Sequence, residues 1–293
     1  MSALVKAGTP VEIHPCADSQ VWVKREDLCC PNPGPSFSKI RGVAAHMYGR
    51  PEKIIGVLDT YHSKAGWAVA YACRETGKRA VVYWPRYKGD PMLPALPRSP
   101  QQKAHGLGAE CVALKAGRSA ILYHAAKADL RERFGPDAYM MPNALKLRET
   151  VEETAVEVAR TGPVPPGLGS GTVVISVSSG TIAAGVLSGL AAVGLFPDVV
   201  LHLGYSRSKA AVKQYVEGLG QFIVAVEQGT DRELGFIPEF RTQIVDEGFG
   251  YKDAAGGPEP FPCNRYYDLK AWRWLERHVA ELAQPVLFWN IGS

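Results

Sequence analysis

Short apolar runs rich in β-branched residues alternate with amphipathic stretches from about residue 53 onward. Apolar runs of roughly four to eight residues indicate strands, whereas apolar residues three and four apart indicate helices. We expect strands at 53–58, 79–84, 110–114, 172–177, 199–203, 222–226 and 284–289. We expect helices at 64–75, 99–107, 119–134, 147–160 and 182–193. Strands that alternate with helices predict an α/β fold, with helices covering parallel sheets.

Glycines follow three of these helices, at Gly77, Gly108 and Gly135, where a helix commonly ends. The three strand-helix repeats that they close predict a compact lobe. A Pro- and Gly-rich stretch at 162–171 separates the helix at 147–160 from the strand that follows it.

Composition excludes several classes of protein. The 293 residues are 46% hydrophobic, enough for a large core, and the net charge of +4 is spread along the chain without a block of like charges. This distribution does not favour nucleic acid as a partner. The sequence lacks an apolar run that could span a membrane and an N-terminal leader, so we expect a cytoplasmic protein without a membrane partner. None of the six cysteines has C-x-x-C spacing, and no metal site is expected.

A serine-rich turn, S-V-S-S-G-T-I at 176–182, lies between a predicted strand and a predicted helix. Backbone N–H groups at a helix N-terminus attract anions, and small residues let a phosphate approach them closely. The turn is therefore a candidate phosphate site. Serine and glycine are also ordinary helix-capping residues, which is the alternative interpretation.

A second segment, V-W-V-K-R-E-D-L at 21–28, is expected to be an extended strand that leads through a Pro/Gly loop to P-S-F-S-K-I-R-G at 35–42. Lys39 stands at the expected start of a helix, close in sequence to Arg41. A desolvated lysine near another cation loses its proton more readily and can act as a nucleophile. A solvated lysine is the alternative.

In their order along the chain, the lysine segment first and the serine-rich turn after it, the two motifs resemble the fold type II pyridoxal-5′-phosphate (PLP) enzymes, the tryptophan synthase β-subunit superfamily. Within it the likeness is to 1-aminocyclopropane-1-carboxylate (ACC) deaminase and D-cysteine desulfhydrase, and S-F-S-K-I-R-G is also similar to the threonine and serine dehydratases. The resemblance implies two lobes of open parallel sheet with flanking helices, and a homodimer. Residues 1–44 and 146–293 would form the large PLP-binding domain, and residues 45–145 a small lobe that moves to close over the substrate.

The resemblance also implies residue roles. Lys39 matches the lysine that forms a Schiff base with PLP, and Ser63, in Y-H-S-K-A-G, matches the serine that meets the substrate carboxylate. Tyr267 and Asp268, in Y-D-L-K, match a tyrosine that faces the substrate and an acid that pairs with the pyridine nitrogen. The phosphate loop would be Ser178, Ser179, Gly180 and Thr181.

Two departures from the family pattern bear on the substrate. Lys64 replaces an asparagine that binds the cofactor's 3′-oxygen, and its amine could bind that oxygen or contact a substrate anion. Tyr251 is either the family's second active-site tyrosine or a plain loop aromatic. Asp268 has an alternative as well, since an aspartate there could simply cap the helix that begins near Leu269.

The resemblance therefore implies a PLP-dependent lyase or deaminase that acts at the α- and β-carbons of a small amino acid through Lys39. One alternative is a PLP-dependent decarboxylase or β-replacement enzyme, whose amino-acid group could be tethered to a modified nucleobase. Nucleic acid would be a partner only in that case. A further alternative is a protein that binds PLP without turnover.

Overall fold

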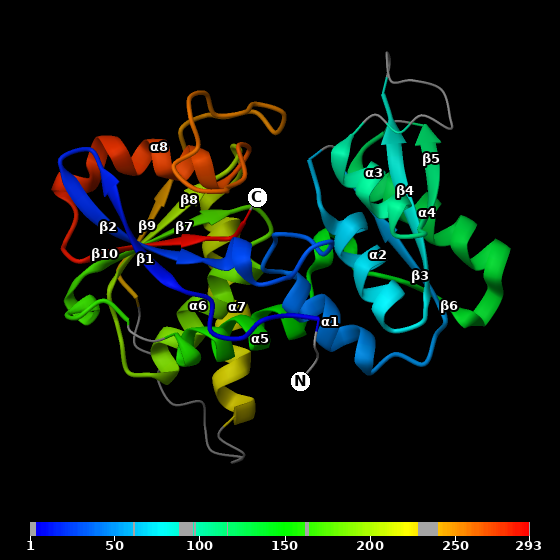
Figure 1. Ribbon diagram of the computed structural model, residues 1–293, viewed down its shortest axis with the longest axis horizontal. Coiled ribbons are helices and arrows are strands. Elements are labelled where there is room, and N and C mark those ends of the chain that lie inside the picture. Colours follow the sequence, from blue (N-terminus) through cyan, green and yellow to red (C-terminus); the bar gives the residue numbers. More distant parts are fainter. Residues whose placement is uncertain are drawn as a thin grey trace. The chain divides into compact units, whose positions relative to one another are not determined.

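The computed structural model describes residues 4–60, 62–87, 96, 98–115, 117–161, 164–227 and 240–292. The chain forms two compact units (Figure 1). Unit 1 comprises Met1–Val5, Cys30–Pro35 and Val43–Leu147, and unit 2 comprises Lys6–Cys29, Ser36–Gly42 and Arg148–Ser293. The segment 45–145, expected to be a small lobe, lies within unit 1, and its movement stays a prediction.

Unit 1 is built on a four-stranded parallel sheet with the strand order β5-β4-β3-β6. The strands are β3 (Ile54–Leu58), β4 (Arg79–Arg86), β5 (Glu110–Lys115) and β6 (Ala138–Met140). The helices are α2 (Ala65–Glu75), α3 (Ser99–Gly106), α4 (Ser119–Phe134) and the larger part of α1 (Ile40–Tyr48). Because α2, α3 and α4 each follow a strand, they begin at the edge of the sheet where the strands end.

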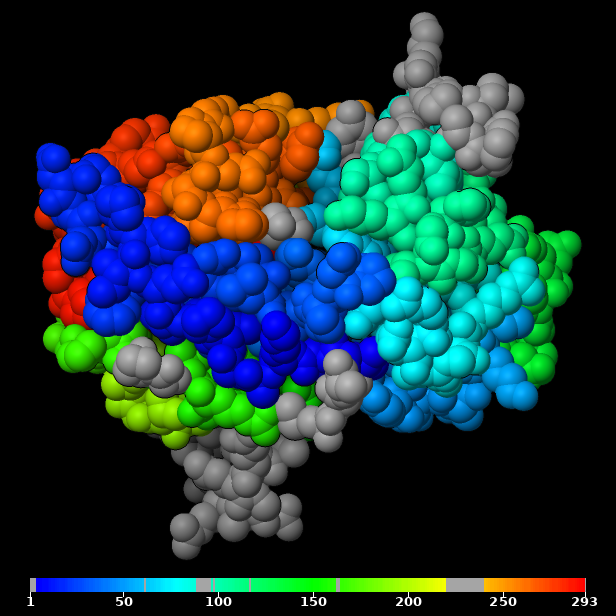
Figure 2. All heavy atoms as spheres, in the orientation of Figure 1, coloured from blue at the N-terminus to red at the C-terminus, as the bar shows by residue number. Residues whose placement is uncertain are grey.

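Unit 2 is built on a six-stranded sheet with the order β1-β2-β10-β7-β8-β9, in which only β1 pairs antiparallel among the described strands. The strands are β1 (Val11–Cys16), β2 (Ser19–Arg25), β7 (Thr172–Val177), β8 (Asp198–Leu203), β9 (Thr242–Val245) and β10 (Val286–Asn290). The helices are α5 (Arg148–Arg160), α6 (Thr181–Ala192), α7 (Lys209–Glu227) and α8 (Asp268–His278). The edge strand β1 lies on the surface shown in dark blue in Figure 2.

Helices cover both faces of the sheet in unit 2, and each face has its own core. Side chains of α5, α6 and α7 pack against Val173, Ile175 and Leu287 on one face. Side chains of α8 pack against Val174 and Phe288 on the other face, and Figure 1 shows α8 opposite to α5–α7. This arrangement, like that of unit 1, confirms the expected α/β class with parallel sheets and flanking helices.

One expected strand is wrong. Residues 222–226 lie inside α7, because a short apolar run cannot be assigned to a strand or a buried helix from periodicity alone. Strands β1, β6 and β9 were not expected, and β6 and β9 are runs of only three and four residues, A-Y-M and T-Q-I-V. Within the ranges that the structure describes, no helix has the length and apolarity needed to cross a membrane.

Candidate active site

Lys39 directly precedes α1 and is held in place by the end of the chain. The N–H of Ser38 donates to the carbonyl of Ile291 at 2.9 Å. Gly292, at φ +119°, passes so close to this loop that a Cβ would lie 2.2 Å from the carbonyl oxygen of Ser36. The Lys39 side chain is only 8% exposed, and its Nζ donates to Ser179 Oγ at 2.6 Å. The structure therefore brings Lys39 to the serine-rich turn.

The serine-rich turn connects β7 to α6 and contains all four residues expected to hold a phosphate. Gly180 is the N-cap of α6 at φ +91°, a left-handed conformation that glycine adopts without strain. Ser179 Oγ lies 3.1 Å from Thr181 Oγ1, and α6 has no acidic residue in its first turn. The helix N-terminus and the amine of Lys39 together make this turn attractive to an anion.

Asp268 is the first residue of α8 and is 1% exposed. Its Oδ1 accepts a hydrogen bond from Ser176 Oγ at 2.5 Å and from the N–H of Ile291 at 3.4 Å. Both of these partners lie outside α8. A buried carboxylate thus stands where β7 and β10 end, at the same edge of the sheet as the serine-rich turn.

Tyr267 extends this cluster, and its hydroxyl is hydrogen-bonded to Ser178 and to Tyr251. Burial is the main reason why the pKa of Tyr267 lies well above its ordinary value. The ring of Tyr251 also packs edge-on against Tyr205, with ring centres 5.1 Å apart. The structure thus places Tyr251, which sequence alone left open, beside Tyr267.

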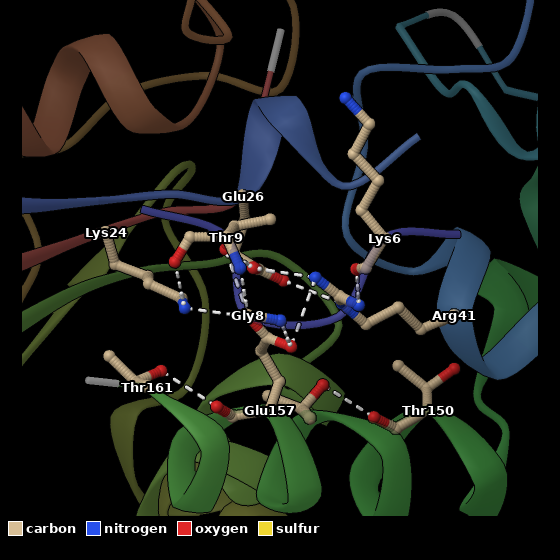
Figure 3. A network of polar contacts seen from close by, with 10 residues as sticks. Lys6, Gly8, Thr9, Lys24, Glu26, Arg41, Thr150, Glu157 and Thr161 are labelled. Carbon is tan, nitrogen blue, oxygen red and sulfur yellow. Dashed lines mark hydrogen bonds and ion pairs between the residues drawn. The ribbon is translucent and has the colours of Figure 1, made fainter. Parts of the chain in front are cut away.

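A buried ionic network includes Arg41, two residues after Lys39, and Figure 3 shows its members. Lys24 Nζ is 2.7 Å from Glu157 Oε1, and Arg41 Nη2 is 3.1 Å from Glu26 Oε1 and 3.4 Å from Glu157 Oε2. Each of the two cations faces a carboxylate, so the buried charges balance. Burial alone would raise the pKa of Glu157, but Arg41 and Lys24 hold it below its ordinary value. The network links β2 to the start of α1, two residues beyond Lys39.

Sequence reasoning did not identify Glu157. A signal was present, since Thr150, Thr154, Glu157 and Thr161 recur at helical spacing and form a polar stripe along α5. All four are buried. A buried polar stripe on a helix needs partners, and here Glu157 accepts hydrogen bonds from the N–H groups of Gly8 and Thr9.

Ser63 and Lys64 share a different turn, between β3 and α2 of unit 1. Ser63 Oγ accepts a hydrogen bond from the N–H of Ala65 at 3.0 Å, and Lys64 is the N-cap residue of α2. Asp59, which sequence reasoning missed, is 1% exposed at the end of β3 and lies beside Ser63 and the N–H of Gly66, although neither of its oxygens has a hydrogen-bond partner of good geometry in the described part of the chain. Burial raises the pKa of Asp59 to about 7.

The cluster in unit 2 fits pyridoxal phosphate. Lys39 offers an amine for the aldehyde, the turn at 178–181 offers N–H groups for the phosphate, and Asp268 offers a buried carboxylate for the ring nitrogen. The hydrogen bond from Lys39 Nζ to Ser179 Oγ brings the amine to the turn. One small molecule that binds the amine and the turn requires this closeness.

Comparisons with known proteins agree with this chemistry. The family model of pyridoxal-phosphate dependent enzymes matches residues 3–230. A "Glycyl-dTMP PLP-dependent decarboxylase" of Pseudomonas phage M6 is 52% identical over 296 residues, which cover 99% of this chain and 100% of that protein.

Solved structures share the fold at low sequence identity. An ACC deaminase homologue has a TM-score of 0.79 at 19% identity, covering 99% of this chain and 90% of that one. An L-serine ammonia-lyase from Rhizomucor miehei has a TM-score of 0.62 at 15% identity, covering 100% of this chain and 95% of that one.

Proposed function

Because this chain belongs to the pyridoxal-phosphate dependent enzymes of fold type II, with PLP as its cofactor, we propose that it removes the carboxyl group of a glycyl unit carried on a thymidine nucleotide. The observation that carries the proposal is the 52% identity, over essentially the whole of both chains, with a protein named for that reaction. The proposal selects the decarboxylase among the alternatives that the sequence left open. Lyase or deaminase chemistry is the competing outcome.

The residues of unit 2 would each have a defined task. When bound, PLP withdraws electrons from the bonds at the substrate α-carbon, and the protein decides which bond breaks. Lys39 would hold the cofactor covalently, and the turn at 178–181 would hold its phosphate. Asp268, kept in place by Ser176 and Ile291, would keep the ring nitrogen protonated and so strengthen the withdrawal.

Proton delivery is the second requirement. Decarboxylation exchanges the carboxylate on the α-carbon for a proton, so each molecule of carbon dioxide released consumes one proton. Lys39 and Tyr267 are candidate donors in the described part of unit 2. Burial makes Tyr267 a weaker acid than an ordinary tyrosine, so its case as a donor rests on its contact with Ser178, which fixes it beside the turn that would hold the cofactor.

Unit 1 would contribute to substrate binding through the turn after β3. Ser63 is proposed to meet the substrate carboxylate, and Lys64 supplies an amine next to it, where the family has an uncharged asparagine. A cation at this position suits a substrate that carries phosphate in addition to its amino-acid group.

The test is to incubate the holoenzyme with glycyl-dTMP that carries a labelled carboxyl carbon, and to follow carbon dioxide, ammonia and keto acid together. We expect labelled carbon dioxide in equal amount to an amine product, and none with Lys39→Ala. Ammonia and keto acid without carbon dioxide would instead favour the lyase or deaminase. A changed cofactor absorbance without any product would favour a PLP-binding protein without turnover.

A further inference from the structure

The loop that joins β8 to α7, residues 204–208, lies at the same edge of the unit 2 sheet as the serine-rich turn. The N–H of Gly204 donates to the carbonyl of Val177, the last residue of β7, at 3.1 Å. A Cβ at Gly204 would lie 2.3 Å from the ring of Tyr267, so the loop passes close to that ring only because it has glycine there. The loop therefore borders the candidate active site, and none of the roles proposed above uses it.

Ser206 anchors the middle of this loop. Its N–H donates to the carbonyl of Phe249 at 2.8 Å, and its Oγ donates to Asp246 Oδ1 at 2.7 Å. Hydrogen bonds from Ser206 and from a backbone N–H hold the pKa of Asp246 below its ordinary value, so this carboxylate is charged and already engaged. The side chains on either side of Ser206, those of Tyr205 and Arg207, therefore extend from a fixed backbone.

Arg207 brings a positive charge to the loop. No carboxylate of the described residues lies within 4.0 Å of its guanidinium nitrogens, and the guanidinium lies 5.4 Å from the ring centre of Tyr205. Its Nε is buried and has no hydrogen-bond acceptor in the described part of the chain. The side chain as a whole is only half-buried. The guanidinium thus keeps donors for an anionic group that the described residues do not supply.

Tyr205 continues a row of tyrosines that begins at Tyr267. The hydroxyl of Tyr267 is hydrogen-bonded to Tyr251, and the ring of Tyr251 packs edge-on against Tyr205 with 5.1 Å between the ring centres. All three tyrosines are half-buried, so each keeps part of its surface accessible. Aromatic rings are surfaces on which nucleobases stack, and an arginine beside them can pair with a phosphate.

We propose that Tyr205 and Arg207 bind the nucleotide part of the substrate, with the pyrimidine ring on Tyr205 and a phosphate on the guanidinium of Arg207. The choice of a thymidine nucleotide rests on the proposed function. When the glycyl unit is carried on the base, the α-carbon, the pyrimidine ring and the phosphate follow one another along the substrate. The protein offers partners in the same order, from Tyr267 at the candidate active site through Tyr205 to Arg207.

The cofactor is a second source of phosphate near this loop. The charge of Arg207 opposes the rise in pKa that burial causes in Tyr215, and a Cβ at Gly180 would lie 3.0 Å from the Tyr215 ring. The N–H groups of the turn at 178–181 already serve the cofactor phosphate. We therefore assign the guanidinium to the phosphate of the substrate, and the experiment distinguishes the two.

The experiment titrates the holoenzyme with dTMP and with thymidine, which lacks the phosphate, in a calorimeter. We expect the wild type to bind dTMP more tightly than thymidine. Arg207→Ala should bind dTMP about tenfold more weakly and thymidine as before, because it loses one charge-assisted contact. Tyr205→Ala should weaken the binding of both by about tenfold, whereas Tyr205→Phe, which keeps the ring, should bind both as the wild type does.

The matched controls are Arg241→Ala and Phe196→Ala, exposed residues just before β9 and β8, at the opposite edge of the same sheet. Neither control should change the affinity for dTMP or thymidine. The trinucleotide TpTpT, whose phosphates are diesters, distinguishes a free nucleotide from a DNA strand. Weaker binding of TpTpT than of dTMP would indicate the free nucleotide, and tighter binding that is lost in Arg207→Ala would indicate a strand.

The inference is overturned if the wild type does not bind dTMP, or if Arg207→Ala weakens the binding of dTMP and thymidine equally. Titration of the apo-protein with PLP separates the two phosphates, since Arg207→Ala should keep the PLP affinity of the wild type. A tenfold loss of PLP affinity would assign the guanidinium to the cofactor and contradict the inference.

Because dTMP carries no glycyl group, these affinities are independent of turnover. With glycyl-dTMP as the substrate, Arg207→Ala should lower kcat/KM by about tenfold, mostly through the KM, because the contact lies away from the reacting carbon. Absence of carbon dioxide from the wild type would contradict the proposed function and leave the measured dTMP affinity standing.

Discussion

Two turns of this protein have the same architecture and opposite chemistry. Both connect a parallel strand to a helix, the turn after β7 in unit 2 and the turn after β3 in unit 1. The first is built of small uncharged residues, with Gly180 as the helix N-cap. The second has a buried carboxylate, Asp59, and a cation at the helix N-cap, Lys64.

The difference shows how one backbone arrangement serves two kinds of ligand contact. Small side chains expose the N–H groups of the turn, so a phosphate can approach the backbone itself. A lysine side chain instead extends away from the backbone of its turn. It binds a ligand through the anionic groups that the ligand carries. This difference supports the proposal that the turn at 178–181 holds the cofactor and that the turn at 59–64 meets the substrate.

The largest expected effect tests which turn serves the cofactor. Lys39→Ala should lower turnover by a factor on the order of 10⁴, because it removes both the covalent link to PLP and a proton carrier. Borohydride reduction of the wild type, followed by peptide mapping, should find the label on Lys39. Lys64→Ala should keep the label. A label on Lys64 would reverse the assignment of the two turns.

Asp268→Asn should have the next largest effect. The variant should keep PLP through Lys39 and the turn at 178–181, but turnover should slow by on the order of 10², because a neutral amide holds the ring proton less well. Asp18→Asn, in the exposed turn between β1 and β2, is the control. Unchanged turnover in Asp268→Asn would leave this residue with a structural role only.

The same substitution made in each turn sharpens the comparison. Ser179→Asp should weaken PLP binding by about 10², since a carboxylate would stand where the phosphate binds. Ser63→Asp should leave the PLP affinity unchanged and raise the KM by about tenfold through repulsion of the substrate carboxylate. Titration of the apo-protein with PLP and steady-state kinetics measure the two effects. Similar losses of PLP affinity in both variants would remove the distinction.

The smallest expected effect is a pH dependence of stability, which we expect from the buried Asp59 in the turn after β3. Its pKa of about 7 exceeds the ordinary 3.8, so the native state holds this proton more tightly than the unfolded state. The resulting stabilisation is complete below about pH 4 and is lost as the pH rises through 7, in total about 4 kcal/mol. The free energy of urea unfolding should show this fall relative to Asp59→Asn, whose amide does not ionise. Parallel profiles for the two proteins would contradict the assignment.

The sequence by itself determined the fold class, the family and the cofactor. Local spacing was sufficient for most elements, because apolar periodicity reflects which face of a strand or helix is buried. The strand predicted at 222–226 was wrong, because a short apolar run suits a strand and a buried helix equally well. The lysine and serine motifs at 35–42 and 176–182 were recognisable because each is continuous in sequence.

Only the tertiary structure decided which distant residues act together. The contact of Lys39 with Ser179 and that of Asp268 with Ser176 join segments far apart in the chain. Parallel strands make such contacts possible, because they place the residues that follow every strand at one edge of the sheet, whatever their separation in sequence.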